Sequence, residues 1–258
     1  MACAIPLGFR SNAIATTIST RDANCIAPRF LPRIAPPKRF PIVMAKELTD
    51  ENAAIESVNA WIHGLGFLAS IPAAIALLVA ASHHSHGIFW ACAVYGVSLS
   101  AMYLFSTLSH AVAQPERRKQ MRSIDQGVIY TLIAGTFTPF IWSNMQGWPR
   151  VALLIFVWLA AAAGFYSKVL TQHRVDNMTS VTYILLGWVP AIALFWTTSL
   201  LCFGTMLLGG LIYTLGVLFL QNDHKAWYFH PVWHLMVILA SATHYAGIWL
   251  FAVWHWDR

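Results

Sequence analysis

Two histidines four residues apart, His230 and His234, are the part of this sequence best suited to bind a metal ion. In a helix this spacing places both side chains on one face, one turn from each other. Neutral imidazole is the commonest protein ligand for zinc. The pair opens an apolar run, where an imidazole that faces lipid is costly. Because two ligands do not complete a zinc site, we expect other parts of the chain to supply ligands at the same depth.

The elements that position this pair are predicted to be membrane-spanning helices. Of the 258 residues, 58% are hydrophobic, 10% are charged and 12 are tryptophan, which exceeds the apolar content of soluble domains. Polar breaks separate apolar runs that approach or exceed the length of about 20 residues needed to cross a bilayer. The runs cover residues 60–81, 88–113, 124–143, 150–170, 178–197, 200–220 and 230–254. The predicted fold class is therefore all-α, an integral membrane bundle of seven transmembrane helices.

The polar breaks predict how the bundle is oriented. One side, shared with the N-terminus, carries eight basic residues near the spans: Lys46, Arg117, Arg118, Lys119, Arg122, Lys168, Arg174 and Lys225. The other side carries only Arg150 and Arg258. The positive-inside rule then predicts the N-terminus inside and the C-terminus outside. Four of the inner residues fall in the segment Gln114 to Arg122, which is predicted to be a loop.

Residues 1–46 have the composition of an organelle transit peptide, disordered and separate from the bundle. They hold seven basic residues and one acid, Asp22, whereas residues 47–258 hold nine of each. The segment Ile42 to Ala45 resembles a plastid processing site, which predicts a chloroplast membrane, with a mitochondrial or other internal membrane as the alternative. A basic disordered tail on a protein targeted elsewhere is the other interpretation. Since residues 47–258 carry no net charge, nucleic acid is not expected as a partner.

This orientation predicts which polar side chains reach the depth of the first pair. The second span ends on the inner side with Ser106 and His110 one turn apart, and the third begins there with Asp125 in its first turn. The seventh span also begins there, with His230 and His234. Five polar side chains from three helices are therefore predicted to converge, and this coincidence is the main functional signal in the sequence.

Each of these residues has a simpler interpretation when taken alone. His110 can be an interfacial or hydrogen-bonded histidine, and Ser106 a helix-packing serine. Asp125 can cap its helix or pair with Arg122 three residues earlier. Burying a charged side chain at the membrane centre costs about 2.5–3.5 kcal/mol, and less at the interface. Their joint placement at one depth favours a shared site.

The predicted site is a catalytic zinc held by His110, His230 and His234, because three histidines and one open position form a known catalytic ligand set. Such a zinc activates water and polarises a carbonyl. Asp125 is expected to accept a proton from the water or to orient it, and Ser106 to hydrogen-bond it.

Four further features concern this site or the histidines outside it. Pro231 fits a first helical turn and is expected to push His230 into a non-helical conformation. His244 lies about 15 Å beyond His234 along a helix, so it is expected to pack or hydrogen-bond elsewhere. His83, His84 and His86 are placed in an outer loop. Glu56, Asn59 and His63 share one helical face at the inner end of the first span, either as a supporting shell for the metal or as an amphipathic turn.

The sequence resembles a haemolysin III-type member of the progestin and adipoQ receptor (PAQR) family, which is related to alkaline ceramidases and plant heptahelical proteins. Residues 47–258 carry the resemblance through four motifs in order: Glu56-x-x-Asn59-x-x-x-His63, Ser106-x-x-x-His110, Asp125-x-Gly127-Val128 with Gly135-x-x-x-Pro139, and His230-x-x-x-His234. The resemblance implies a seven-helix fold with zinc on His110, His230 and His234, and with Ser106 and Asp125 beside the metal-bound water. Ile62 and Val128-Ile129 depart from the usual motifs without removing a ligand.

Three functions fit these features. The first is a zinc-dependent lipid amide or ester hydrolase of the ceramidase type, for which a membrane lipid is the expected substrate. The second is a membrane receptor or sensor in which zinc is structural. The third is a haemolysin-like pore, which the apolar middle and outer halves of the spans disfavour. The sequence leaves the oligomeric state and the exact substrate open.

Overall fold

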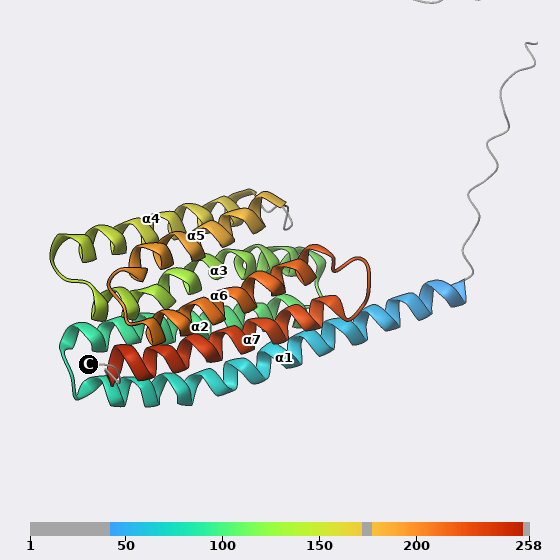
Figure 1. Cartoon of the computed structure of the whole chain (residues 1–258). Coiled ribbons are helices and arrows are strands. Elements are labelled where there is room, and N and C mark those ends of the chain that lie inside the picture. The colour runs from blue at the N-terminus through green and yellow to red at the C-terminus, as the bar shows by residue number, and fades with distance from the viewer. Residues whose placement is uncertain (1–41, 172–176, 255–258) are drawn as a thin grey trace, which may run out of the picture. The chain divides into compact units, whose positions relative to one another are not determined.

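The computed structural model describes residues 42–171 and 177–254, and every regular element in these ranges is helical (Figure 1). The elements are α1 (Ile42–Ser82), α2 (His86–Ala111), α3 (Pro115–Asn144), α4 (Gly147–Thr171), α5 (Asn177–Phe195), α6 (Leu200–Gln221), α7 (Phe229–Gly247) and the π-helix η1 (Ile248–Val253). The predicted all-α class is confirmed. The predicted leader lies outside the described residues up to residue 41, and its predicted end at residue 46 falls within α1.

The helices are those of a multi-pass membrane protein. By length and composition, five helical segments in the described ranges are able to cross a membrane: Asn52–Ser82, His86–Ala111, Gly147–Leu170, Leu200–Gln221 and Phe229–Val253. The remaining two are α3, which starts with a charged stretch, and α5, whose described apolar part is the shorter Ser180–Phe195. Large apolar side chains such as Leu68, Leu159 and Ile192 are exposed on the outside of the bundle. Lipid contact explains an outward face of this kind.

The segment Gln114 to Arg122 was predicted to be a loop, and this prediction is wrong. Helix α3 begins at Pro115, and the Arg118 amide donates to the Gln114 carbonyl at 2.8 Å. Proline suits the first helical position because its fixed φ is helical and no backbone donor is needed there. The basic residues therefore lie on the first turns of α3, and Asp125 lies about three turns into the helix rather than in its first turn.

The chemistry-bearing helices pack closely because small residues lie between them. A Cβ atom added to Gly96 of α2 would lie 2.9 Å from the Cβ of Ala74 in α1, and one added to Gly135 of α3 would lie 2.6 Å from Ser98 Oγ in α2. Small residues of this kind let membrane helices approach each other closely. Helix α2 thus packs against both α1 and α3, while α7 packs against α1 and α6.

Successive helices run in opposite directions, so the turns between them lie at two ends of the bundle. The two ends differ in the residues they carry. The end formed by the first part of α1, the α2–α3 turn and the α6–α7 turn is named the basic end, because Arg117, Arg118, Lys119, Arg122 and Lys225 lie there. The opposite end presents the highly exposed indoles of Trp148 and Trp196. Exposed tryptophans are typical of membrane–water interfaces.

Candidate metal centre

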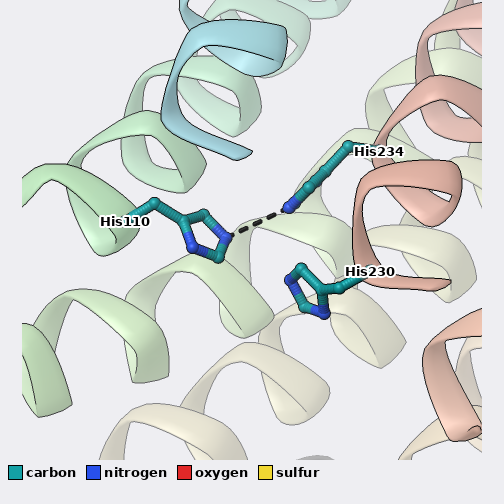
Figure 2. Close-up of side chains that lie close together, drawn as sticks. All are labelled: His110, His230 and His234. Carbon is teal, nitrogen blue, oxygen red and sulfur yellow. Dashed lines mark hydrogen bonds between the residues drawn. The ribbon is translucent and has the colours of Figure 1, made fainter. Parts of the chain in front are cut away.

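Three imidazoles meet at the basic end of the bundle. His110 comes from the last turn of α2, and His230 and His234 come from the first two turns of α7. One ring nitrogen from each lies within 4.8 Å of the other two, and the Nε2 atoms of His110 and His234 are 3.1 Å apart (Figure 2). The structure therefore brings the three predicted ligands together in a cluster that could hold a metal ion.

The predicted non-helical conformation of His230 is wrong. Helix α7 begins one residue earlier, at Phe229, so His230 has a helical backbone and Pro231 still lies in the first turn. The amide donors of a first helical turn have no partner within the helix, so proline is tolerated there without breaking it. The Val232 amide already donates to the Tyr228 carbonyl at 3.0 Å, which fixes both histidines on one helical face.

The Nδ1 atom of His110 is engaged by a carboxylate. It lies 2.7 Å from Glu56 Oε2, and the other oxygen of Glu56 accepts a hydrogen bond from Arg122 at 2.5 Å. Because an ionised carboxylate only accepts, His110 must carry its proton on Nδ1. Its Nε2 lone pair is then directed at the centre, as in metal-bound histidines that donate their other N–H to a carboxylate.

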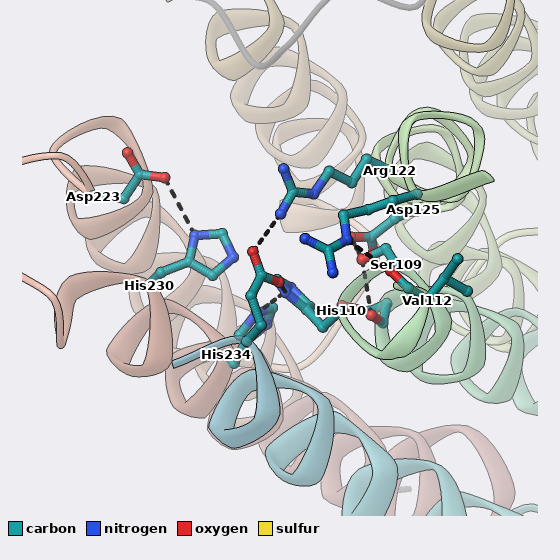
Figure 3. Close-up of polar contacts among 11 residues, drawn as sticks. Ser109, His110, Val112, Arg122, Asp125, Asp223, His230 and His234 are labelled. Carbon is teal, nitrogen blue, oxygen red and sulfur yellow. Dashed lines mark hydrogen bonds and ion pairs between the residues drawn. The ribbon is translucent and has the colours of Figure 1, made fainter. Parts of the chain in front are cut away.

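The Nδ1 atoms of the other two imidazoles also have partners, a carboxylate for His230 and another imidazole for His234. Asp223 Oδ2, in the α6–α7 turn, lies 3.3 Å from His230 Nδ1 (Figure 3). On His234, Nδ1 lies 3.1 Å from His63 Nε2. With every Nδ1 engaged from outside, the three Nε2 atoms are the ones left for a shared ligand.

This donor set fits a metal ion. Two ligand nitrogens on one tetrahedral zinc lie about 3.3 Å apart, since each Zn–N bond is about 2.0–2.1 Å long. The 3.1 Å separation between the Nε2 atoms of His110 and His234 matches that geometry. Two imidazole lone pairs at this distance repel unless a proton or a cation lies with them. The three residues are thus suited to hold zinc or a similar divalent ion, with at least one position left for another ligand.

Three residues of α1 were predicted to support the metal centre, and two of them contact a candidate ligand. Glu56 contacts His110, and His63 contacts His234 through both the ring and the backbone carbonyl, at 3.1 and 3.3 Å. Asn59 is buried in the wall of the same cavity, and its Oδ1 has no partner among the described residues. Two of the three residues therefore touch a candidate ligand directly, and Asn59 does not.

Changing Glu56 to glutamine is expected to weaken metal binding by about 10- to 100-fold, which is the usual cost of losing a partner that orients a ligand. The amide cannot accept from both His110 and Arg122, so one contact is lost and the ring loses its orientation. Metal affinity measured by competition with a chelator tests this. The control is Glu116→Gln, an exposed acid in the first turn of α3. Equal affinity in both variants would contradict a positioning role for Glu56.

A carboxylate lies beside the three imidazoles. Asp125, from α3, lines the cavity that contains them, and Ser109 Oγ lies 3.0 Å from Asp125 Oδ2 and 2.9 Å from the Ser106 carbonyl. Ser106 itself is buried in the wall of that cavity. Asp125 therefore receives side-chain hydrogen bonds from two serines of α2, Ser109 and the predicted Ser106.

The centre lies in a cavity of about 1210 Å³, which exceeds the usual volume of a small-molecule site. Its wall combines the polar residues described above with apolar side chains such as Met102, Trp233 and Val237. The cavity also reaches residues of the α6–α7 turn, such as Lys225 and Trp227, both of which are exposed. A molecule with polar and apolar parts would find both kinds of contact here.

Four of the other described histidines, His83, His84, His86 and His244, lie outside the centre. As expected, His244 makes a separate hydrogen bond, from Nε2 to the Met206 carbonyl at 3.2 Å. His83 and His84 lie in the α1–α2 turn, while His86 is the first residue of α2 instead of a loop residue. In the part of the chain that the structure describes, they join no cluster of potential metal ligands.

Two residues of the site were missed from the sequence. Asp223 precedes His230 by seven residues in a turn, and a polar turn residue gives no sign of the direction in which it points. Ser109 follows Ser106 by three residues, so the two serines lie about one turn apart on the same helix. Only Ser106 was predicted to belong to the site. An acid in the turn that leads into a ligand-bearing helix is the signal that identifies Asp223.

Comparison with known proteins gives consistent matches across the helical region. A family model described as "Haemolysin-III related" matches residues 52–245. Hemolysin-3 of Bacillus cereus is 37% identical over 191 residues, covering 72% of this chain and 87% of that protein. The Hemolysin-3 homolog of Bacillus subtilis (strain 168) is 33% identical over 204 residues, covering 77% and 94%. The human Monocyte to macrophage differentiation factor is 30% identical over 167 residues, covering 61% and 68%.

Proposed function

Since this chain belongs to the haemolysin-III-related (PAQR) family of multi-pass membrane proteins, we propose that it is a metal-dependent hydrolase of a lipid amide or ester. The observation that carries this proposal is the pairing of a three-histidine centre with Asp125 in one cavity at the basic end of the bundle. Three neutral ligands leave the metal strongly electrophilic and leave room for substrate, as in catalytic zinc sites.

The metal supplies Lewis acidity, which polarises a carbonyl and makes a neighbouring water nucleophilic near neutral pH. The protein residues have three tasks. His110, His230 and His234 hold the ion, each oriented through its Nδ1. Asp125 accepts a proton from the attacking water and returns it to the leaving group. The apolar wall of the cavity holds the acyl part of the substrate.

The contacts of Ser109 suit a carboxylate that gains and loses a proton. While Asp125 is ionised, the Ser109 hydroxyl donates to it at 3.0 Å. Once Asp125 is protonated, it can donate to Ser109 Oγ, and the hydroxyl then turns to the Ser106 carbonyl at 2.9 Å. One hydroxyl therefore stabilises both protonation states without moving its oxygen, which favours proton transfer through Asp125.

Metal content and lipid turnover of the purified full chain test this function together. We expect about one zinc per chain, as in other three-histidine sites, and release of fatty acid from at least one class of N-acyl or O-acyl lipid. Removal of the metal with a chelator should stop release, and added zinc should restore it. A chain that retains its metal but cleaves none of a panel of ceramides, N-acyl amines, monoacyl- and diacylglycerolipids would overturn the proposal.

A receptor or sensor with structural metal is the second candidate, and one set of contacts favours it. The centre and its partners tie α1, α2, α3 and α7 together through Glu56, His110, Arg122 and His234. An ion at this junction would fix the relative positions of four helices. In that case the metal is needed for stability, whereas the proton-transfer function of Asp125 is not.

A further inference from the structure

Basic side chains line the mouth of the cavity on two sides. Arg118, Lys119 and Arg122 come from the start of α3, and Lys225 comes from the α6–α7 turn. This turn is ordered: the Lys225 amide donates to the Asn222 carbonyl at 2.9 Å, and Asp223 of the same turn contacts a candidate ligand. The turn therefore holds the backbone of Lys225 at the wall of the cavity that contains the metal centre.

The two lysines differ from the two arginines in their contacts. Arg122 is paired with Glu56, and Arg118 Nε donates to the Val112 carbonyl at 2.7 Å. Lys119 and Lys225 are exposed, and within the described residues neither has an ion-pair partner. Their ammonium groups are therefore free to meet a ligand at the mouth.

The acids of the cavity do not offset these charges. Glu56 is engaged by His110 and Arg122, and Asp223 by His230. Asp125 is deeper, beside the metal centre, in contact with Ser109. The acids of the cavity thus have histidine, arginine or serine partners, whereas Lys119 and Lys225 at its entrance have no ion-pair partner among the described residues, which favours an amphiphile with an anionic head.

The positive-inside rule explains why basic residues lie on the inner side of the membrane. It does not require them to line a cavity. Arg117 shows this directly, because it is exposed, immediately precedes Arg118 in sequence, and is not part of the cavity lining. It therefore carries the same charge in the same region without facing the site. This makes Arg117 a matched control for Lys119.

We propose that Lys119 and Lys225 select a lipid with an anionic headgroup, which places its acyl carbonyl at the metal centre. This inference rests on the proposed hydrolase function and names its substrate class. In a glycerolipid a few bonds separate the charged group from the ester carbonyls, so a headgroup at the mouth leaves the carbonyl inside the cavity. Lysines at a membrane surface attract anionic lipids and favour them over zwitterionic ones.

Lipid binding to the full-length protein tests this without depending on turnover. The protein is reconstituted in phosphatidylcholine nanodiscs, and exchange of labelled phosphatidylglycerol is compared with exchange of labelled phosphatidylcholine of the same acyl chains. We expect preferential retention of phosphatidylglycerol. Lys119→Gln and Lys225→Gln should each reduce that preference about fivefold, as expected for one charge near an anionic lipid. Arg117→Gln should leave the preference unchanged, and glycerol phosphate in solution should not compete.

Five outcomes separate the possibilities. Equal retention of the two lipids, or an equal loss in Arg117→Gln, would overturn selection at the cavity mouth. Competition by glycerol phosphate at the same concentration as the lipid would indicate a soluble anion and would also overturn it. Lysine-dependent retention without fatty acid release would support the headgroup site and contradict the hydrolase. Fatty acid release at equal rates from both lipids, unchanged in the lysine variants, would support the hydrolase and contradict headgroup selection.

Discussion

Replacing His234 with alanine is expected to remove the metal almost completely, and fatty acid release with it. Structural zinc sites with four ligands bind with about 10–16 kcal/mol, or about 3 kcal/mol for each ligand, so one lost ligand weakens binding at least about 100-fold. The effect should be large at this position because His234 connects the centre: its Nε2 faces His110 and its Nδ1 contacts His63. The remaining histidines then form a site with two ligands.

Elemental analysis of the purified variant measures this effect. Two control substitutions separate loss of a ligand from loss of a histidine. His86→Ala removes an exposed histidine at the start of α2, and His244→Ala removes one whose ring nitrogens are buried and which bonds to Met206. Both should keep the wild-type metal content if they fold. Unchanged metal content in His234→Ala, and likewise in His110→Ala and His230→Ala, would rule out the centre.

Replacing Asp125 with asparagine is expected to leave the metal bound but to lower fatty acid release by about 10²- to 10⁴-fold, the usual contribution of a general acid–base group. Asparagine has nearly the same shape and can still accept from Ser109, so the packing of α3 against α2 is kept. It cannot take up a proton from water. Turnover should therefore fall while metal content and thermal stability stay close to those of the wild type.

A smaller loss of turnover is expected for Ser109→Ala than for Asp125→Asn. This change keeps the carboxylate but removes the hydroxyl that stabilises it in both protonation states, so turnover should fall by about tenfold, the value of one lost hydrogen bond of about 1.4 kcal/mol. Wild-type turnover in Asp125→Asn would mean that another group moves the proton. Loss of metal in Asp125→Asn would instead indicate that the aspartate is itself a ligand.

The His234 and Asp125 variants together distinguish the two candidate functions. In a hydrolase, both variants lose activity, but only His234→Ala loses the metal. In a receptor with structural metal, His234→Ala destabilises the bundle, and Asp125→Asn has little effect on any measured response. Thermal denaturation of both variants, with and without chelator, is therefore measured alongside fatty acid release.

The sequence predicted the helices and the clustering of three candidate ligands through two independent patterns. Apolar runs of membrane-spanning length gave the positions of the spans, and all seven correspond to a described helix. The bias of basic residues then assigned each span a direction, which placed His110, His230 and His234 at one end of the bundle. The structure brings these three residues together, although no single motif contains them.

Local polarity led to the two errors in the helix boundaries. The start of α3 is rich in charge, so hydropathy could not distinguish it from a loop, whereas its backbone hydrogen bonds continue to Pro115. For His230, the preference against helix before proline was given too much weight, because a helix that begins at Phe229 already fixes that residue.

Side-chain partners were the least predictable part of the site. The contact between His230 and Asp223 depends on the path of the α6–α7 turn, and that between Asp125 and Ser109 on the rotation of α3 relative to α2. Sequence spacing gives the face of one helix but not its rotation against a neighbour. Glu56 and His63 could be predicted as neighbours of the site because their spacing and depth were both known, while the bonds they form could not.

The contact between His110 and His234 joins residues 124 positions apart, and α7 is the last of the seven helices to be synthesised. A nascent chain that lacks α7 contains one of the three imidazoles and cannot retain the ion. If the three histidines hold a metal as proposed, its loading would follow insertion of the whole helical region into the membrane. In the proposed metal-bound protein, the ion would thus mark completed biogenesis, and a truncated or wrongly inserted chain would differ from the finished protein by being metal-free.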